Sequence, residues 1–302
     1  MKKATMKDIA EKANVSTATV SYIINNLTTQ TIPHETRERV LRIARELNYV
    51  PNLAARSLVK QKSGMIGILL NRKAENGYWR DFAYSEFIRK LERHLTGKGF
   101  HVLLYSMDAE APSLEIITER KLDGVFLIDV REEEFYTISQ KFQVPLVLID
   151  SLIPDPLFYK IAMDFESAVK RAKAFIPKFD FLVMDCFNNE GMRKALEQSA
   201  GVSEDHIHLV TGEDELKLFI EGQSGKKGLF TNEFLGLKAL DRLNPKDIVT
   251  ICSCGCPMIL PEESQKVMFT EDKASAAFDV MMQLIQGKNP SAGRKYVMLK
   301  AE

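Results

Sequence analysis

The sequence predicts an all-α head, residues 1–50, followed by an α/β body, residues 64–302, built from two doubly wound parallel-sheet subdomains. In the head, apolar residues recur at helical spacing. From Met65 onward, short apolar runs alternate with amphipathic stretches, which is the order typical of parallel sheets.

The balance of basic and acidic side chains changes at the same place in the sequence. Residues 1–62 hold 11 of the 41 basic and five of the 41 acidic side chains, which leaves 30 and 36 for the rest. A basic head on an acidic body is expected where only the head touches a polyanion.

Three helices are predicted in the head. Thr5 is a natural N-cap for MKDIAEKA, residues 6–13, whose apolar side chains share one face. After the turn NVS, a second helix over about 17–25 buries its valine and isoleucines against the first. A third, residues 35–48, carries its arginines away from its apolar side. Two short helices joined by a three-residue turn and braced by a third indicate a helix-turn-helix.

The second predicted helix carries an unusual number of hydroxyl side chains on one surface. Val, Ile and Thr are mediocre helix formers, and Ser and Thr compete for backbone hydrogen bonds. If the apolar residues face inward, the side chains left outside are those of Thr17, Ala18, Ser21, Tyr22 and Asn25. Short hydroxyl and amide groups can approach base edges and phosphates closely. The alternative is a surface helix whose hydroxyls only meet water, and the basic surplus of the head argues against it.

The segment after the head, PNLAARSLVKQKS over residues 51–63, combines a short helix rich in alanine with a polar linker. It would not form a stable domain alone. An ordinary linker helix is the simplest interpretation of these residues by themselves.

The body shows two successive sets of strands. Between them lies a predicted helix over 165–176, and an earlier amphipathic helix covers about 80–97. Two such α/β units indicate two parallel-sheet subdomains with a cleft at the carboxyl ends of their strands, where ligands bind in this class of sheet. The predicted strands are residues 65–70, 101–106, 124–129, 145–150, 179–185, 207–211, 227–231 and 247–252.

The head sequences MKDIAEKANVSTATVSYIINN and TRERVLRIARELNYVPNLAARSL closely resemble the head of the LacI/GalR (lactose/purine repressor) family. The resemblance implies that Thr17, Ala18 and Tyr22 contact DNA bases. Tyr22 stands where Arg or His is common, so the operator sequence does not carry over from a relative. By the same resemblance, the phosphate-contacting residues are Thr5, Ser16, Thr19, Ser21 and Asn25.

The resemblance also implies that residues 51–63 form a hinge helix, which orders on operator DNA and pairs with its copy from a second subunit. Leu58 matches the family's minor-groove wedge, with Asn52 and Ala55 beside it. Small residues let two helices approach in a narrow groove, and an apolar wedge kinks a base step at a cost of a few kcal/mol.

The body resembles the family's periplasmic-binding-protein-like (type I) core through IAMDFESAVKRA and LFTNEFLGLKAL, although it is shorter. This implies that TEDKASAAFDVMMQLIQG crosses back to the first subdomain as a helix and that YVMLK ends the chain on the second. The boundaries that follow are about 64–160 with 270–288 for the first subdomain, and about 161–269 with 289–302 for the second.

For the cleft, the resemblance implies effector-binding positions at Tyr78, Trp79, Asn188 and Asn232. Two departures matter. The family's sugar-binding arginine falls at Asn188, and ICSCGCPM stands where its sugar-clamping aspartate belongs. Because charge-assisted hydrogen bonds are the stronger contacts of such a site, a sugar is doubtful. A different small molecule, or an effector-independent regulator with a degenerate cleft, fits better.

The cysteines offer another alternative. Cys252, Cys254 and Cys256 follow one predicted strand, and Cys186 ends another. If both strand ends face the cleft, four thiols converge and a metal- or thiol-sensing regulator results. The spacing is not the usual C-x-x-C pair, and cysteine is often simply buried, so packing is the favoured interpretation.

Taken together, the sequence indicates a sequence-specific DNA-binding transcription regulator, a repressor that binds a palindromic operator as a homodimer and responds to a small-molecule effector. No nucleophile and base are paired recognisably, so we expect no enzyme, and we expect no cofactor and no metal. No apolar run reaches the roughly 18–20 residues of a membrane span, and the basic start lacks the apolar core of a signal peptide. Four cysteines make no disulfide framework, so we expect a cytoplasmic protein without a membrane partner.

Overall fold

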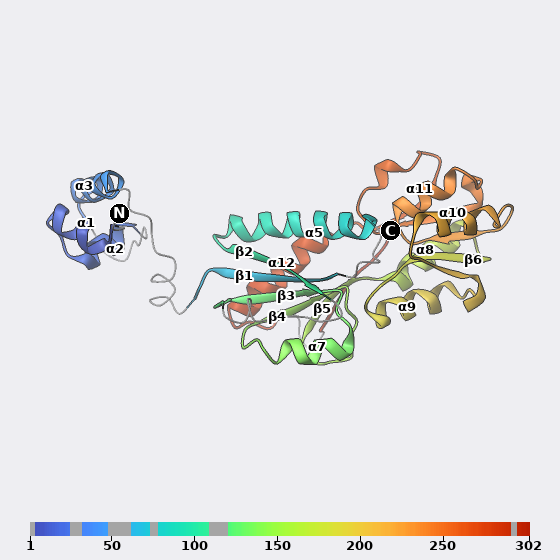
Figure 1. Ribbon diagram of the computed structural model, residues 1–302, viewed down its shortest axis with the longest axis horizontal. Coiled ribbons are helices and arrows are strands. Elements are labelled where there is room, and N and C mark those ends of the chain that lie inside the picture. The colour runs from blue at the N-terminus through green and yellow to red at the C-terminus, as the bar shows by residue number, and fades with distance from the viewer. Residues whose placement is uncertain (1–3, 25–31, 48–61, 73–77, 109–119, 291–294) are drawn as a thin grey trace. The chain divides into compact units, whose positions relative to one another are not determined.

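The computed structural model describes residues 4–24, 32–47, 62–72, 78–108, 120–290 and 295–302. It divides into two compact units, the head, Met1–Ser63, and the body, Gly64–Glu302 (Figure 1). No helix in these described ranges is long and apolar enough to span a membrane.

The head contains the three predicted helices: α1 (Met6–Ala13), α2 (Thr17–Ile24) and α3 (His34–Glu46). Thr5 and Asp8 form a reciprocal capping box that fixes the start of α1. Asn14 ends α1 in the left-handed region, at φ 51°, a conformation that Asn tolerates better than most residues. The three helices enclose a small core centred on Ile9, Val20 and Val40, all fully buried.

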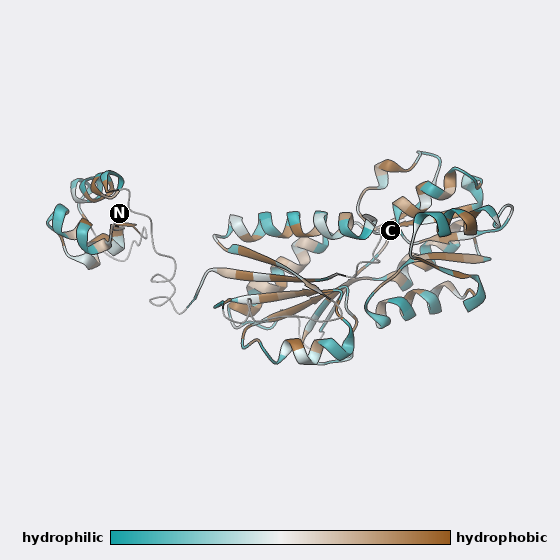
Figure 2. Ribbon diagram, viewed as in Figure 1, coloured by the Kyte–Doolittle hydropathy of each residue, from teal (hydrophilic) through white to brown (hydrophobic). Residues whose placement is uncertain are grey.

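The first sheet of the body is parallel, in the order β11-β5-β4-β3-β1-β2. Its apolar strands alternate with helices, as the sequence predicts. Helices α5 and α12 cover one face and α7 covers the other, and the brown strands between teal-edged helices in Figure 2 show the resulting layers. The bounds are β1 (Met65–Arg72), α5 (Tyr78–Gly97), β2 (His101–Asp108), β3 (Gly124–Ile128), α7 (Glu132–Ser139), β4 (Leu146–Ile149), β5 (Tyr159–Met163), α12 (Lys273–Ile285) and β11 (Tyr296–Leu299).

The second sheet is also parallel, in the order β10-β9-β8-β6-β7. Helices α8 and α9 pack on one face, and α10 and α11 pack on the other. Its elements are α8 (Phe165–Phe175), β6 (Phe181–Asp185), α9 (Glu190–Ala200), β7 (Ile207–Val210), α10 (Glu213–Glu221), β8 (Gly228–Phe230), α11 (Glu233–Leu240), β9 (Ile248–Cys252) and β10 (Gln265–Met268). Two doubly wound parallel sheets after a helical head confirm the predicted fold class.

One boundary prediction is wrong. Strand β11 pairs with β5 in the first sheet, with Tyr296 opposite Lys160, so YVMLK does not lie on the second subdomain. Strand β5 likewise carries the first subdomain to Met163, beyond the predicted 160. Only the last residues cross over, where Ala301 bridges Phe269. The reason is that β5 leaves an edge open in the first sheet, and four apolar residues do not reveal which open edge they will fill.

Candidate nucleic-acid interface and interdomain cleft

The outward face of α2 carries the residues predicted to meet DNA. Ser16, Thr17 and Ala18 are exposed at its start. Val20 and Ile23, by contrast, are buried in the head core. The described part of the helix therefore has the two-sided character inferred from its sequence. Three further predicted contact residues are half-buried: Thr19, Ser21 and Tyr22. Asn25 lies outside the described residues, as do the predicted hinge residues Asn52, Ala55 and Leu58.

Some of these hydroxyls also hold the helix. Ser16 Oγ accepts a hydrogen bond from the Thr19 backbone N–H at 3.0 Å and lies 2.9 Å from Thr19 Oγ1. The Thr5 hydroxyl donates to Asp8 Oδ2 at 2.7 Å. Ser16 therefore acts as the N-cap of α2, a role that the sequence analysis did not assign to it. A shallow groove beside Ser16 and Thr17 is bordered by Lys7, so hydroxyls and a cation share one surface.

The side chain of Trp79 packs against the subdomain to which its helix does not belong. It stands in the first turn of α5, yet its side chain is buried in the core of the second subdomain with Phe181, Val183 and Phe230. Its indole also hydrogen-bonds to Asp185 at the end of β6. Trp79 therefore links the subdomains, whereas the sequence predicts that it lines an open cleft. Tyr78 begins α5.

Arg80 and Asp129 form a buried ion pair at the same junction. Asp129 directly follows β3, in the first subdomain, and has a left-handed φ of 54°. It also accepts hydrogen bonds from the second subdomain: the Asn188 Nδ2 at 2.9 Å and the backbone N–H groups of Asn188 and Asn189, both at 3.2 Å. The guanidinium of Arg80 stacks 4.8 Å from the Phe187 ring centroid. One carboxylate thus gathers donors from both subdomains and holds them together.

The two predicted asparagines are engaged by the chain itself. Asn232 is fully buried, caps α11 through Leu235 N–H, and donates to both oxygens of Asp185 at 2.8 and 2.9 Å. Asn188 turns its Nδ2 toward Asp129, while its buried Oδ1 has no hydrogen-bond partner among the described residues. The sequence analysis missed Arg80, Asp129 and Asp185, because each is a single charged residue whose partner is distant in the chain.

The cysteine-rich turn is organised around a carboxylate. Glu233 accepts hydrogen bonds from the backbone N–H groups of Cys254 at 2.9 Å and Cys256 at 2.8 Å, while Gly255 adopts a φ of +76° between them. Small side chains and a glycine allow the backbone to wrap around the Glu233 carboxylate. These residue types in ICSCGCPM are thus explained by a backbone turn.

The thiols do not converge. Cys186 donates to the Val210 carbonyl, while Cys254 donates to that of Trp79. Burial, followed by the negative charge of Glu233, raises the pKa of Cys252 and raises that of Cys256 to about 12. Raised pKa values disfavour the reactive thiolate. All four cysteines are free, and the described ranges contain no group of three His, Cys, Asp or Glu side chains placed to bind a metal.

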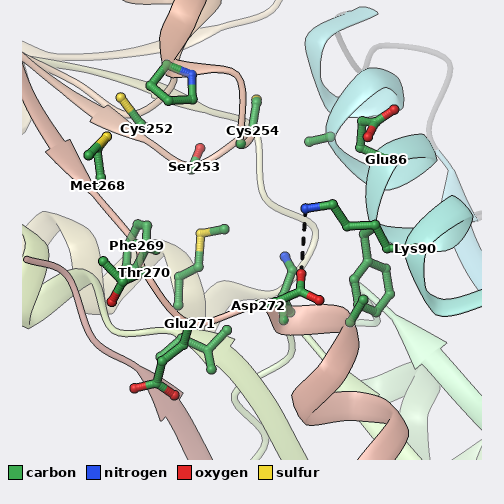
Figure 3. A pocket seen from close by; sticks show the side chains of 18 of the residues that line it. Glu86, Lys90, Cys252, Ser253, Cys254, Met268, Phe269, Thr270, Glu271 and Asp272 are labelled. Carbon is green, nitrogen blue, oxygen red and sulfur yellow. Dashed lines mark ion pairs between the residues drawn. The ribbon is translucent and has the colours of Figure 1, made fainter. Parts of the chain in front are cut away.

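Two adjacent cavities with a common wall lie beside the Arg80 network. The inner chamber, about 40 Å³, is bordered by Arg80, Tyr84, Asp150, Asp185 and Lys273. The outer chamber, about 390 Å³, lies between α5, the cysteine turn and the crossover into α12 (Figure 3). Both chambers are bordered by Ala83, Met163, Ser253, Cys254 and Lys273.

Comparison with known proteins agrees with the head and the fold. Residues 5–52 match the model of the "Bacterial regulatory proteins, lacI family". The catabolite control protein A of Staphylococcus xylosus is 32% identical over 172 residues, which are 55% of this chain and 50% of that protein. The transcriptional repressor PurR of Photobacterium profundum is 30% identical over 164 residues, 52% of this chain and 47% of that one. The matches thus span about half the length of these relatives.

Solved structures share the architecture along the whole chain. A lac repressor dimer bound to operator and the anti-inducer ONPF superposes with a TM-score of 0.74 at 17% identity, covering 100% of this chain and 97% of that one. A LacI-family regulator from Silicibacter pomeroyi gives 0.69 at 16% identity, covering 99% and 98%. At this identity the likeness establishes the fold, including the two-sheet body.

Proposed function

We propose that this protein, whose head belongs to the lacI family of bacterial regulatory proteins, represses transcription by binding a roughly palindromic operator as a homodimer in the cytoplasm. The observation that carries the proposal is the two-sided α2. Its apolar side is buried in a helix-turn-helix core, and its hydroxyl side, including Ser16 and Thr17, is exposed. A helix of this kind can enter the major groove without the head rearranging.

Within this proposal, bases are contacted by Thr17, Ala18 and Tyr22. Phosphates are contacted by Thr5, Ser16, Thr19, Ser21 and Asn25. The exposure of Thr17 and Ala18 supports the first assignment, and the position of Ser16 at the N-terminus of α2, beside Lys7, supports the second.

The test is selection of binding sites by the full-length protein from a random DNA pool. Enrichment of palindromes with steeply salt-dependent binding is expected, and failure to enrich any sequence would refute the proposal.

Residues 51–63 act in this scheme as a hinge helix, with Leu58 as the minor-groove wedge beside Asn52 and Ala55. A helix of about eight residues is too short to be stable alone in water, so it should form only on DNA. Leu58→Ala removes the wedge without changing any charge. Operator affinity and DNA bending should both fall while non-specific binding survives. Unchanged bending would contradict the hinge assignment.

A homodimer is supported by apolar side chains exposed on the body. Phe82 on α5 and Leu237 on α11 are each more than one-third exposed, and the Phe82 ring meets Phe234 edge-on at 5.3 Å between centroids. Neighbouring exposed apolar side chains mark interaction surfaces. Leu237→Asp should therefore give monomers in sedimentation, whereas Leu218→Asp, at a more exposed leucine on α10, should not. If both variants remain dimeric, the dimer contact lies elsewhere on the protein.

An effector acting on the body completes the proposal. A sugar held in the predicted manner receives little support, because Asn232 is fully engaged and Arg80 is paired with Asp129. The inner chamber is too narrow for a sugar ring, which leaves a slender small molecule or, as the alternative, an effector-independent regulator. A thiol- or metal-sensing role has less support, since Cys186 and Cys254 donate to separate carbonyl groups.

A further inference from the structure

We propose that the two adjacent chambers of the body together bind a small cationic amphiphile, a primary amine whose ammonium group enters the inner chamber while its apolar body fills the outer one. The inference deepens the proposed function and rests on it in one respect: the ligand would be the effector of the DNA-binding head.

The inner chamber contains an unsatisfied acceptor. The side chain of Asp150 is 8% exposed, and its Oδ2 accepts a hydrogen bond from Lys273 Nζ at 2.6 Å. Its Oδ1 is buried and has no hydrogen-bond partner among the described residues. A buried carboxylate oxygen without a donor is costly, so a ligand that supplies an N–H at this point gains free energy.

The charges around this chamber do not balance. Two cations, Arg80 and Lys273, face three buried carboxylates, those of Asp129, Asp150 and Asp185. Asp129 is paired with Arg80, and Asp150 is paired with Lys273. Asp185 borders the chamber, and its side chain accepts hydrogen bonds from neutral donors, among them Asn232, while Arg80 acts on it through charge alone. With all three carboxylates ionised, the cluster lacks one positive charge, which an ammonium supplies and an uncharged sugar does not.

The outer chamber suits an apolar body. Its lining is dominated by carbon and sulfur and includes the half-buried Phe269 and Met163 together with Phe87 and Met268. In Figure 3, the sulfur-bearing Cys252 and Met268 stand opposite Glu86 and Lys90. A volume of about 390 Å³ falls in the range of small-molecule sites, which are mostly apolar with a few fixed polar groups.

The rim of the outer chamber also favours a cation. Glu86 pairs with Arg89, and Asp272 lies 3.6 Å from Lys90. Glu271 is exposed and has no ion-pair partner among the described residues. An anionic ligand would meet this carboxylate on entry and the surplus carboxylate inside.

Head-group size sets a limit on the ligand. A cavity needs roughly 10–15 Å³ to hold one water, so the inner chamber, about 40 Å³, accommodates an ammonium and the carbon attached to it but no sugar ring. The ligand is thus a slender primary amine. Because the two chambers lie between residues of both subdomains, filling them would change how tightly the subdomains close.

The test is calorimetric titration of the full-length protein with hexylamine, phenethylamine and tryptamine. Each is compared with the alcohol and the carboxylate of matching shape. At least one amine should bind about tenfold or more tightly than its alcohol, a preference of about 1.4 kcal/mol, and the carboxylates should bind more weakly still. The inference is overturned if no amine binds, or if an alcohol or a carboxylate binds as tightly as its amine.

Two variants locate the site. Asp150→Asn should abolish the preference for amine over alcohol, whereas Asp247→Asn, at another lysine-paired aspartate remote from both chambers, should leave it intact. Ala83→Leu narrows the wall common to both chambers and should weaken all binding, which keeps the test informative if Asp150→Asn does not fold. An amine preference unchanged in Asp150→Asn, or an amine affinity unchanged in Ala83→Leu, would overturn the assignment.

DNA-site selection on the same preparation separates this inference from the proposed function. Enrichment of operators without amine binding refutes the ligand alone. Amine binding by a protein that enriches no DNA sequence refutes the regulatory role and leaves the ligand site standing.

Discussion

The head and the cleft treat polar side chains in opposite ways. On α2, Ser16 and Thr17 are exposed, and their local hydrogen bonds only shape the helix end. In the cleft, Asp129 and Asn232 are fully or almost fully buried, and their hydrogen bonds are made to other parts of the body. Exposed hydroxyls on a rigid helix leave recognition to an outside partner. A buried network joins the two subdomains and sets the conformation of the body. The difference supports the proposed roles, DNA reading by the head and closure by the cleft.

The largest effect is expected from the head core. Val20→Asp places a charge in a fully buried position, and burying an unpaired charge costs more than about 4 kcal/mol, comparable with the whole stability of a small domain. The head should unfold and DNA binding should disappear, while the body keeps its melting transition. Circular dichroism and gel retardation measure the two effects. Retained sequence-specific binding would show that α2 does not depend on this core.

The next effect concerns closure of the cleft. Arg80→Leu leaves Asp129 without its cation, and breaking a buried pair costs roughly 3–5 kcal/mol. The melting temperature of the body should fall clearly, and the double variant Arg80→Leu/Asp129→Leu should recover much of the loss. Arg89→Leu breaks an exposed pair on the same helix and is the control, with little change expected. Equal melting temperatures for Arg80→Leu and the control would show that the Arg80–Asp129 pair does not hold the two subdomains together.

A smaller effect is expected from pH. Burial raises the pKa of Asp129 to about 6 from an ordinary 3.8, although Arg80 and the Asn189 N–H oppose the rise, and Asp150 adds to it. The folded protein thus holds a proton that the unfolded chain releases, so this group's contribution to stability falls as pH rises from about 4 to about 6. A proton on Asp129 also removes the surplus negative charge. Amine affinity should therefore increase between about pH 5 and pH 7, and a calorimetric titration series that shows no increase would contradict this charge balance.

The smallest effect concerns the cap of α2. Ser16→Ala removes the acceptor for the Thr19 N–H, which costs about 1 kcal/mol of head stability. DNA affinity should weaken alike for all sequences, because a cap and a phosphate contact carry no base information. Thermal unfolding of the head and retardation of two unrelated sites measure this. A changed base preference would indicate that Ser16 contacts DNA bases rather than the phosphate backbone.

The sequence predicts the elements well wherever the pattern is local. The head helices and most strands follow from apolar spacing, and the structure confirms them. Strand β5 escaped prediction because Lys160 interrupts its apolar run, although this lysine is buried and donates to the Phe158 carbonyl at 3.0 Å. Strand β10 is short and begins with polar residues.

The site in the body was harder to predict, because its contacts join distant parts of the chain. Arg80 lies in YWRDFAY, which has the charge pattern of a surface helix, and Asp129 stands 49 residues further along. Nothing local indicates that the two meet. The cysteine turn misled for the opposite reason. A local cluster of sulfurs indicates chemistry, whereas the turn is explained by Glu233 and the backbone around it.

The central claim, that the outward face of α2 reads bases, is tested most directly by Tyr22→Ala. Site selection from a random DNA pool is carried out with this variant and the parent protein under the same salt conditions. Particular operator positions should lose their base preference in the variant, at about 1–3 kcal/mol for each lost contact. Identical base preferences for the two proteins would contradict base reading by this face.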